Sequence, residues 1–451
     1  MGIRDIFGAS VSYPDAIAVE AFGQAAHRQL AYDPDPLASI EAVLEQHPDF
    51  VMGHCFRAGI HLIASDRRYQ EGLAQEARHL RYLAPRANAR EQGHIRAIEY
   101  WLAGDFYASS QAYADVLLRE PRDLCALQFG HQVDFLLGTA ASMRDRVARA
   151  LPHWSEPDAH YPYVLGMLAF GLEEAGHFPQ AEDAAHKALA LNPADTWAIH
   201  ALAHCYEMQG KVDLGIEFLE SSEKIWSREN ALAIHNRWHL ALYYLEHGRF
   251  EDALALHDAH MVVTPRSELM DLHDSAGMLW RLRIDGIALG DRWRVVADRY
   301  AEVADQGYLS FTDMHAMMAF VASGRSAAAD ALVRNLARHA GGEGTNAGVI
   351  RAAGLPIVKG FHEYGFGDLE QAKQLLSSVR HLSHLFGGSV AQRDIINLTL
   401  IDAAIRTRDA PLLEGLIAER TLLKPASPLT DFYLARIGHG PTESGRRAGG
   451  A

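Results

Sequence analysis

The chain has 451 residues, 49% of them hydrophobic and 22% charged, a balance typical of a folded globular protein. Its net charge is −15 and it has no basic block, which argues against nucleic acids and anionic membranes as partners. No stretch approaches the ~18 uninterrupted apolar residues that a membrane-spanning helix needs.

The first helices are predicted over 15–31 and 36–65, where apolar residues recur with helical spacing. Farther along, His131 and Asp134 are three residues apart in another helical segment, close enough for the carboxylate to orient the imidazole. We therefore take both as candidate ligand-binding residues. An ion pair on the helix surface explains the same spacing, and this alternative stays open.

A repeat in the middle of the chain predicts the fold. Segments 163–193 and 197–220 each contain a helix that ends at glycine, a bulky apolar residue, and a second helix with small residues on one face. The turn glycines, Gly176 and Gly210, are 210 − 176 = 34 residues apart, which is the period of tetratricopeptide (TPR) repeats. The predicted fold class is therefore all-α, a TPR-like α-solenoid of antiparallel helix pairs curled around a concave groove or central pocket.

Similar glycine turns recur along the chain, but their spacing drifts. The next intervals are 248 − 210 = 38 and 324 − 248 = 76, or two units of 38. The turn glycines are Gly104, Gly176, Gly210, Gly248, Gly324 and Gly367. Residues 1–436 are predicted to form a single solenoid, clearest over 161–260, and 437–451 a disordered C-terminal tail. The glycine-rich segment 339–354 is predicted to be a flexible loop or break.

The second helical segment of the repeat region carries His200, His204 and Glu207. Residues at i, i+4 and i+7 share one helix face, and the resemblance to TPR repeats implies that this face lines the groove. Two histidines four residues apart are a valid spacing for a divalent metal, and a carboxylate one turn later can bind or orient. The glutamate of the H-E-x-x-H motif is absent, and polar residues that merely line the groove remain the alternative.

Aromatic and imidazole side chains recur in the next repeats. Trp238 and His239 follow His235 on one predicted helix, and His315 occupies the same repeat position as His239 in a later unit. Equivalent positions on separate units are consistent with one shared pocket. They are equally consistent with side chains that pack the repeats together.

A different motif occurs near the end of the chain. Gly387, Gly388 and Ser389 predict a helix stop followed by a new helix N-cap. Arg393 then falls in the first turn, where a positive charge is unfavourable, so we expect it to have a specific partner such as an anionic ligand or a buried carboxylate. His384 lies just before the stop and is a further candidate ligand-binding residue.

Four segments resemble the tetratricopeptide repeat protein 38 family, also called StaR-like: HALAHCYEMQGK, WHLALYYLEHGRFEDAL, SFTDMHAMMAFVASGR and RHLSHLFGGSVAQRD. The resemblance covers most of the chain. It implies a solenoid fold with polar motifs at groove positions, and it supplies no catalytic residues. No dinucleotide or phosphate-binding glycine motif occurs, so neither a flavin nor a nucleotide is expected.

Two functions follow from these patterns. In the first, a pocket lined by histidine and arginine binds a small polar metabolite, and the protein could be an enzyme that acts on it by hydrolysis, isomerisation or a metal-assisted reaction. The alternative is an adaptor that binds a partner peptide or helix in its groove. The candidate catalytic residues are His200, His204, His239 and His315. The candidate ligand-binding residues are Glu207, Trp238, His131, Asp134, His384 and Arg393. The candidate metal ligands are His200 and His204.

The expected environment is the cytoplasm. Three widely spaced cysteines suggest no disulfide framework, and the first residues lack the apolar core of a secretory signal. A divalent metal is the one cofactor that the histidines suggest.

Overall fold

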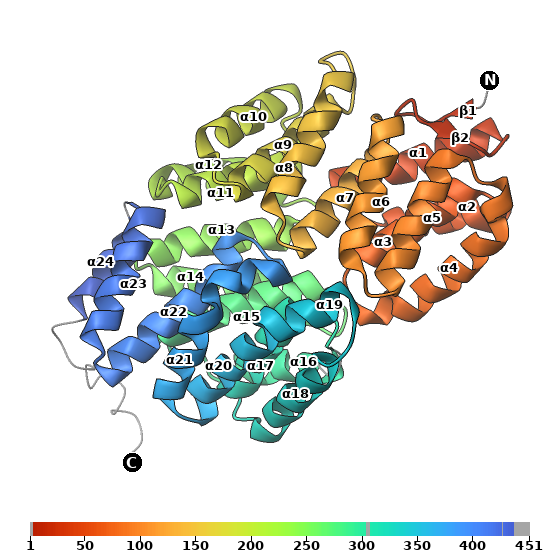
Figure 1. Ribbon diagram of the computed structural model, residues 1–451. Helices are drawn as coiled ribbons and strands as arrows, with labels where there is room; N and C mark the ends of the chain where they lie inside the picture. The colour runs from red at the N-terminus through yellow and green to blue at the C-terminus, as the bar shows by residue number, and fades with distance from the viewer. Residues whose placement is uncertain (1–2, 304–306, 426, 437–451) are drawn as a thin grey trace. The chain divides into compact units, whose positions relative to one another are not determined.

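The computed structural model describes residues 3–303, 307–425 and 427–436, and these are almost entirely helical (Figure 1). Near the start, β1 (Ile3–Arg4) and β2 (Ser10–Val11) pair antiparallel. The helices of the first half are α1 Ala16–Ala31, α2 Pro36–Gln46, α3 Val51–Ile63, α4 Gln70–Leu83, α5 Ala89–Leu102, α6 Phe106–Arg119, α7 Leu124–Leu136, α8 Ala140–Ala150, α9 Tyr161–Glu174, α10 Phe178–Leu191, α11 Thr196–Met208 and α12 Val212–Trp226. Those of the second half are α13 Ala233–Glu246, α14 Phe250–His260, α15 Leu269–Ile284, α16 Arg292–Val303, α17 Ser310–Ala322, α18 Ser326–His339, α19 Gly344–Val349, α20 Leu355–Phe366, α21 Leu369–Val379, α22 Val390–Thr407, α23 Ala410–Leu423 and α24 Pro428–Ala435.

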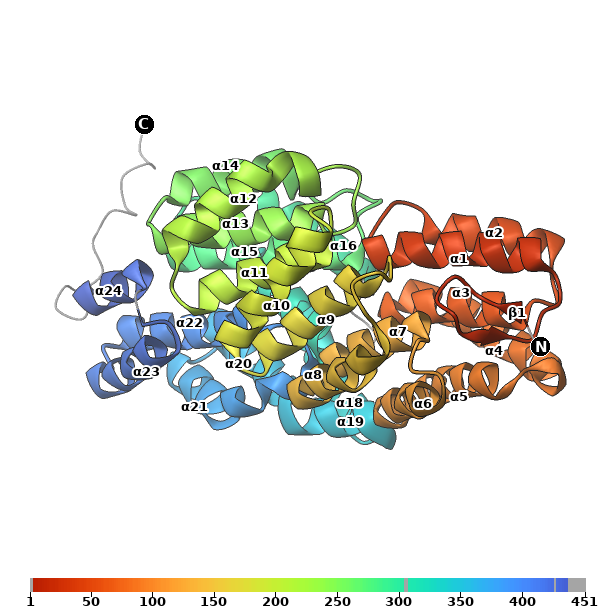
Figure 2. The ribbon, with the colours of Figure 1, turned by 90° about the horizontal axis from the view of Figure 1, so that it is seen from above.

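Successive helices form pairs of the TPR type, which confirms the predicted fold class. The pairs α5/α6, α9/α10 and α20/α21 pack along their lengths and are joined by turns of a few residues. Helices α13, α14 and α15 lie side by side in both ribbon views (Figure 2). No helix in the described ranges is both long enough and apolar enough to span a bilayer.

Glycine ends the first helix of most pairs, as the sequence predicts. Five of the predicted turn glycines adopt positive φ, from 68° at Gly210 to 79° at Gly176, a region that other residues enter at a steric cost. The interval of 76 residues hides one further turn of this kind, because 248 + 38 = 286 and Gly286 has φ 86°. Gly367 also ends α20, but with φ −121° and so outside the left-handed region, and Asp368 caps the next helix.

The chain divides into two compact units. Unit 1 comprises Met1–Leu202, Glu223–Ala233 and Gly342–Gly348, and unit 2 comprises Ala203–Ser222, Ile234–Gly341 and Val349–Ala451. The single solenoid over 1–436 therefore stays a prediction. The predicted tail, 437–451, lies outside the described residues.

The predicted break over 339–354 is wrong for most of its length. After α18 ends, α19 begins at Gly344 and runs through a π-helical turn, Ile350–Gly354, directly into α20. The glycine in this turn has a packing role, because a methyl group on Gly354 would lie 2.0 Å from Ser310 Oγ. Glycine here permits a close approach between helices and does not interrupt the chain.

Local sequence explains how the helices that carry the candidate residues begin. Asp195 caps α11 by accepting hydrogen bonds from the backbone N–H groups of Trp197 and Ala198, both at 3.1 Å. Ser389 caps α22 in a capping box with Gln392, directly after the predicted glycine stop. Both caps fix the helical register and therefore the direction of the side chains one to three turns later.

Candidate functional site

Three histidines of unit 2 converge in its interior. His204 lies on α11, and His235 and His239 lie one turn apart on α13. The ring centroids are 4.3 Å apart for His204 and His239 and 4.9 Å apart for His235 and His239. One possible ligand nitrogen from each of the three lies within 4.8 Å of the others, and all three side chains are buried. His200 lies one turn before His204, on the same face of α11.

Two buried carboxylates lie behind these rings. Asp274 on α15 accepts a hydrogen bond from Nδ1 of His235 at 2.9 Å, and Glu207 on α11 accepts one from Nδ1 of His239 at 3.2 Å. Because a carboxylate only accepts, each Nδ1 carries a proton, and Nε2 is then the nitrogen through which a neutral imidazole binds a metal. A carboxylate behind an imidazole is the usual support of a metal-binding histidine.

The protonation states of His239 and Glu207 also suit a metal-binding histidine supported by a carboxylate. Burial, with the neighbouring His204 as a smaller cause, lowers the pKa of His239 to about 3. Burial alone would raise the pKa of Glu207, but Lys424 and the hydrogen bond from His239 outweigh it and hold this pKa well below its ordinary value. At neutral pH a neutral imidazole therefore faces an ionised carboxylate, and the neutral form is the one that binds metal ions.

Trp238 packs against the histidine centre, and His315 lies near Trp238. The indole of Trp238 stacks on His235 with ring centroids 5.3 Å apart and an angle of 9° between the planes. A methyl group added to Gly277 would lie 3.7 Å from Trp238 Nε1 and 3.8 Å from His315 Nε2, so both side chains border the same glycine. His315 donates from Nδ1 to the Phe311 carbonyl at 2.8 Å. His315 therefore lies near the indole of Trp238.

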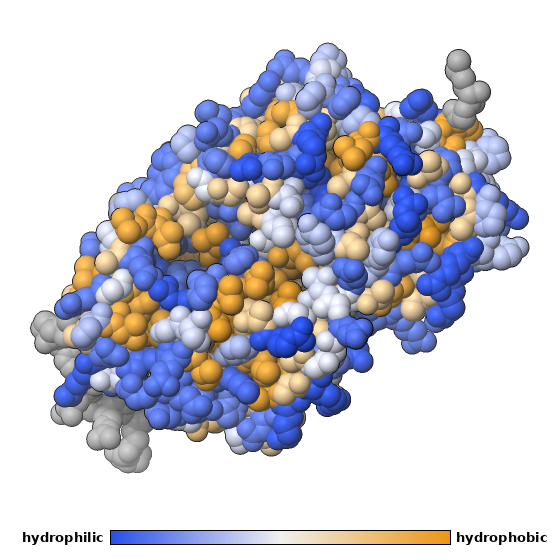
Figure 3. Space-filling model, viewed as in Figure 1, coloured by the Kyte–Doolittle hydropathy of each residue, from blue (hydrophilic) through white to orange (hydrophobic). Residues whose placement is uncertain are grey.

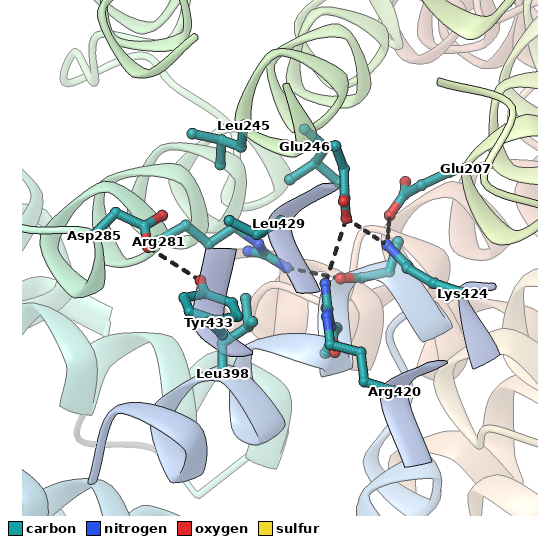
Figure 4. A pocket seen from close by; sticks show the side chains of 13 residues that line it. Glu207, Leu245, Glu246, Arg281, Asp285, Leu398, Arg420, Lys424, Leu429 and Tyr433 are labelled. Atoms are coloured by element: carbon teal, nitrogen blue, oxygen red, sulfur yellow. Dashed lines mark hydrogen bonds and ion pairs between the residues drawn. The ribbon is translucent and has the colours of Figure 1, made fainter. Parts of the chain in front are cut away.

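Buried polar side chains from several helices meet Glu207 at a small cavity (Figure 4). Lys424 Nζ donates to Glu207 Oε1 at 2.8 Å and lies 3.6 Å from Glu246 Oε1. Arg420 reaches the same Glu246 oxygen at 3.4 Å and Asp394 at 2.6 Å. These residues line a cavity of about 20 Å³, room for about one water molecule.

A larger cavity, of about 150 Å³, adjoins the same residues. Figure 3 shows a hollow in this face of the molecule, between the places that α13 and α22 occupy in Figure 1. Its charged lining consists of Arg380, Arg393, Arg420, Lys424, Asp394 and Glu419. Its apolar lining consists of Met208, Val390, Ile401, Leu416 and Leu423. Arg393 is thus part of a cavity, and it donates a hydrogen bond from Nη1 to the Gly388 carbonyl.

Three predicted residues lie elsewhere. His384 is exposed and hydrogen-bonds through Nδ1 to the His381 carbonyl, and it lines neither cavity. His131 and Asp134 belong to unit 1. There Asp134 pairs with Arg146 at 2.8 Å and does not orient the imidazole, because the guanidinium is the stronger donor.

Several residues of the site have no obvious motif in the sequence. Arg281 on α15 is buried, donates to the carbonyls of Gly277 at 3.0 Å and Ala391 at 2.7 Å, and lies 5.2 Å from the Trp238 ring. Asp274 and Arg281 are seven residues apart, hence on one face of α15. Two opposite charges on one face of this helix were the available signal. Lys424 gave no signal, because its partner Glu207 is 217 residues away.

Comparisons with known proteins add little to this geometry. No family model matches the chain. Among solved structures, the chain is similar to one described as "Structure of Naa15/Naa10 bound to HypK-THB", with 13% identity over 95% of this chain and 69% of the other. The TM-score is 0.25, and a likeness of this degree assigns no function.

Proposed function

We propose that unit 2 binds a divalent transition-metal ion at His204, His235 and His239. One observation carries the proposal: Asp274 and Glu207 hold the Nδ1 atoms of two converging histidines. A carboxylate on Nδ1 orients the ring of a metal-binding histidine and raises its basicity as a ligand. A buried cluster of imidazoles suits Zn²⁺, Fe²⁺, Ni²⁺ or Cu²⁺ far better than Mg²⁺ or Ca²⁺.

The metal would give the protein its chemistry. Three protein ligands leave a coordination position for water or a substrate oxygen, and a bound metal lowers the pKa of that water and polarises carbonyl groups. The function we propose is metal-assisted binding and conversion, by hydrolysis or isomerisation, of a small polar metabolite. His204 and His239 are then metal ligands. A proton-transfer role fits His239 less well, because its pKa of about 3 is far from neutral.

An adaptor is the second candidate, and it rests on a different observation. The last two described helices, α23 and α24, expose apolar side chains, most of all Leu422, which is 84% exposed, and Leu423, which is 57% exposed. Such residues are available to a partner helix or peptide. Membership of the tetratricopeptide repeat protein 38 family likewise stays a proposal, supported by the four segments quoted above.

Metal analysis of the purified full-length chain tests the main proposal. We expect about one equivalent of a transition metal per chain after dialysis. His204→Ala and His239→Ala should each lower the metal affinity by tenfold or more, because each removes one of a few ligands. His247→Ala is the matched control: this exposed histidine directly follows α13, and its side chain pairs with the exposed Asp213 at 2.8 Å.

The variants also need a folding check, because His239 is buried. Circular dichroism of each chelated variant shows whether the helices persist. A folded His204→Ala that keeps full metal content, or a wild-type chain that binds no transition metal at micromolar concentration, contradicts the proposal.

A further inference from the structure

We infer that the 150 Å³ cavity of unit 2 binds a small metabolite through a carboxylate or phosphate group. The inference rests on the proposed function, because it names the chemical class of that ligand. The cavity is formed by α22, α23 and the turn before α22, which carries Arg380 and Ser383, and it shares Asp394, Arg420 and Lys424 with the smaller cavity beside Glu207.

The charge of the lining favours an anion. Four cations and two carboxylates line the space, and Glu207 and Glu246, the further partners of Lys424 and Arg420, lie outside the lining. The whole chain has a net charge of −15. A concentration of positive charge in an acidic protein is an arrangement that attracts and holds an anionic ligand.

The donors differ in how firmly they are held. Arg420 and Lys424 are buried, with side chains 6% and 8% exposed, and their ion pairs with Asp394 and Glu207 fix them in place. Arg380 is more accessible and pairs with Glu419 at 2.6 Å. Guanidinium groups bind carboxylates and phosphates through two parallel hydrogen bonds, so Arg380 and Arg393 are suited to such a ligand.

The size of the cavity limits the ligand. A space of about 150 Å³ is comparable to an engineered cavity that holds benzene. The ligand is therefore a compound of about the size of a short dicarboxylate or a small phosphate ester, and a nucleotide is too large. Five apolar side chains on the lining, including Ile401 and Leu416, would contact its carbon skeleton.

Glu207 connects this cavity to the histidine centre. It accepts from Lys424 Nζ through Oε1 and from His239 Nδ1 through Oε2. An anion that draws the Lys424 ammonium toward itself leaves more negative charge for the bond to His239, which makes that imidazole a stronger metal ligand. Anion and metal should therefore bind cooperatively, each raising the affinity for the other by the same factor.

Calorimetric titration with two probes, inorganic phosphate and succinate, tests the inference. We expect one or both to bind the wild-type chain with a Kd below about 1 mM. Arg393→Gln and Arg380→Gln should each raise that Kd by about tenfold, since each removes a charged donor. Arg406→Gln is the control, because Arg406 lies on α22, pairs with Asp402 at 3.7 Å and does not line the cavity.

Titrations of both metal-loaded and chelator-treated protein separate this inference from the metal proposal. Anion binding that persists after chelation and is lost in Arg393→Gln supports the cavity even if no metal is found. A chain that holds stoichiometric metal yet binds neither probe overturns the cavity alone. Equal Kd values for wild type, Arg393→Gln and Arg380→Gln overturn it as well. The probe with the lower Kd shows whether the cavity prefers a phosphate or a carboxylate group.

Discussion

At the scale of single residues, burial makes each charged side chain of the site depend on its partners. Glu207 has a pKa well below its ordinary value, because Lys424 and His239 outweigh the cost of burying it. If one partner were removed, the carboxylate would stay buried with part of its charge uncompensated, which is costly. Glu207 is therefore a positioning residue for both the histidine centre and the basic cavity.

His131 in unit 1 gives a prediction on pH dependence. Burial, with Arg146 as a smaller cause, lowers its pKa to about 3 in the folded chain, against about 6.5 when unfolded. The unfolded state therefore takes up the proton first, and the stabilisation present above pH 6.5 is lost as the pH falls toward 3. Relative to His131→Gln, the wild type should lose about 1.4 kcal/mol of unfolding free energy per pH unit between about pH 6 and 4.

Urea unfolding of both chains across this pH range measures the difference. Because the comparison is between two chains that share every other titrating group, opposing contributions from buried aspartates such as Asp195 cancel. Parallel pH profiles for the two chains would contradict a neutral buried imidazole at this position.

At the scale of helices, close packing depends on particular glycines. A methyl group on Gly171, inside α9, would lie 2.8 Å from the Cα of Arg144, a backbone atom that cannot rotate away. Gly415, inside α23, has open space around it. Gly171→Ala should therefore cost about 1–3 kcal/mol of stability through overpacking. Gly415→Ala should add about 0.5–1 kcal/mol, because alanine favours the helix. Chemical denaturation of both variants checks the prediction: their midpoints should shift in opposite directions from the wild type. Two shifts of the same sign would refute it.

The helices and their turns were predictable because their signals are local. A glycine that must adopt positive φ, as at Gly176 and Gly210, is readable within one turn of chain. The doubled interval even pointed to the turn at Gly286. The break over 339–354 was mispredicted because glycine there serves packing against Ser310, a contact between distant residues.

The candidate site was predictable only in part, for the same reason. His200, His204 and Glu207 share a helix face, so their spacing is visible in the sequence. The partners that define their chemistry come from far along the chain: Asp274 lies 39 residues after His235, and Lys424 lies 217 residues after Glu207. No periodic pattern links such residues.

Across the whole molecule, each unit has its own buried charge network. In unit 1, Arg90 lies between Asp5 at 2.8 Å and Asp123 at 2.7 Å, and His94 adds a third bond to Asp123 at 2.8 Å. In unit 2 the corresponding network runs through Glu207, Lys424, Glu246 and Arg420. Of these two networks, the second adjoins the histidine centre through Glu207.

Metal removal should therefore loosen one unit and spare the other. A metal held by His204, His235 and His239 joins α11 to α13, and Asp274 extends the connection to α15. Its binding free energy adds to the stability of those helices alone. On chelation, hydrogen–deuterium exchange should accelerate in α13 and α15, with α5, α6 and α7 unchanged as an internal reference. Re-addition of Zn²⁺ should restore protection. Acceleration in both units alike, or in neither, would mean that the histidine centre is held together by its carboxylates without an ion.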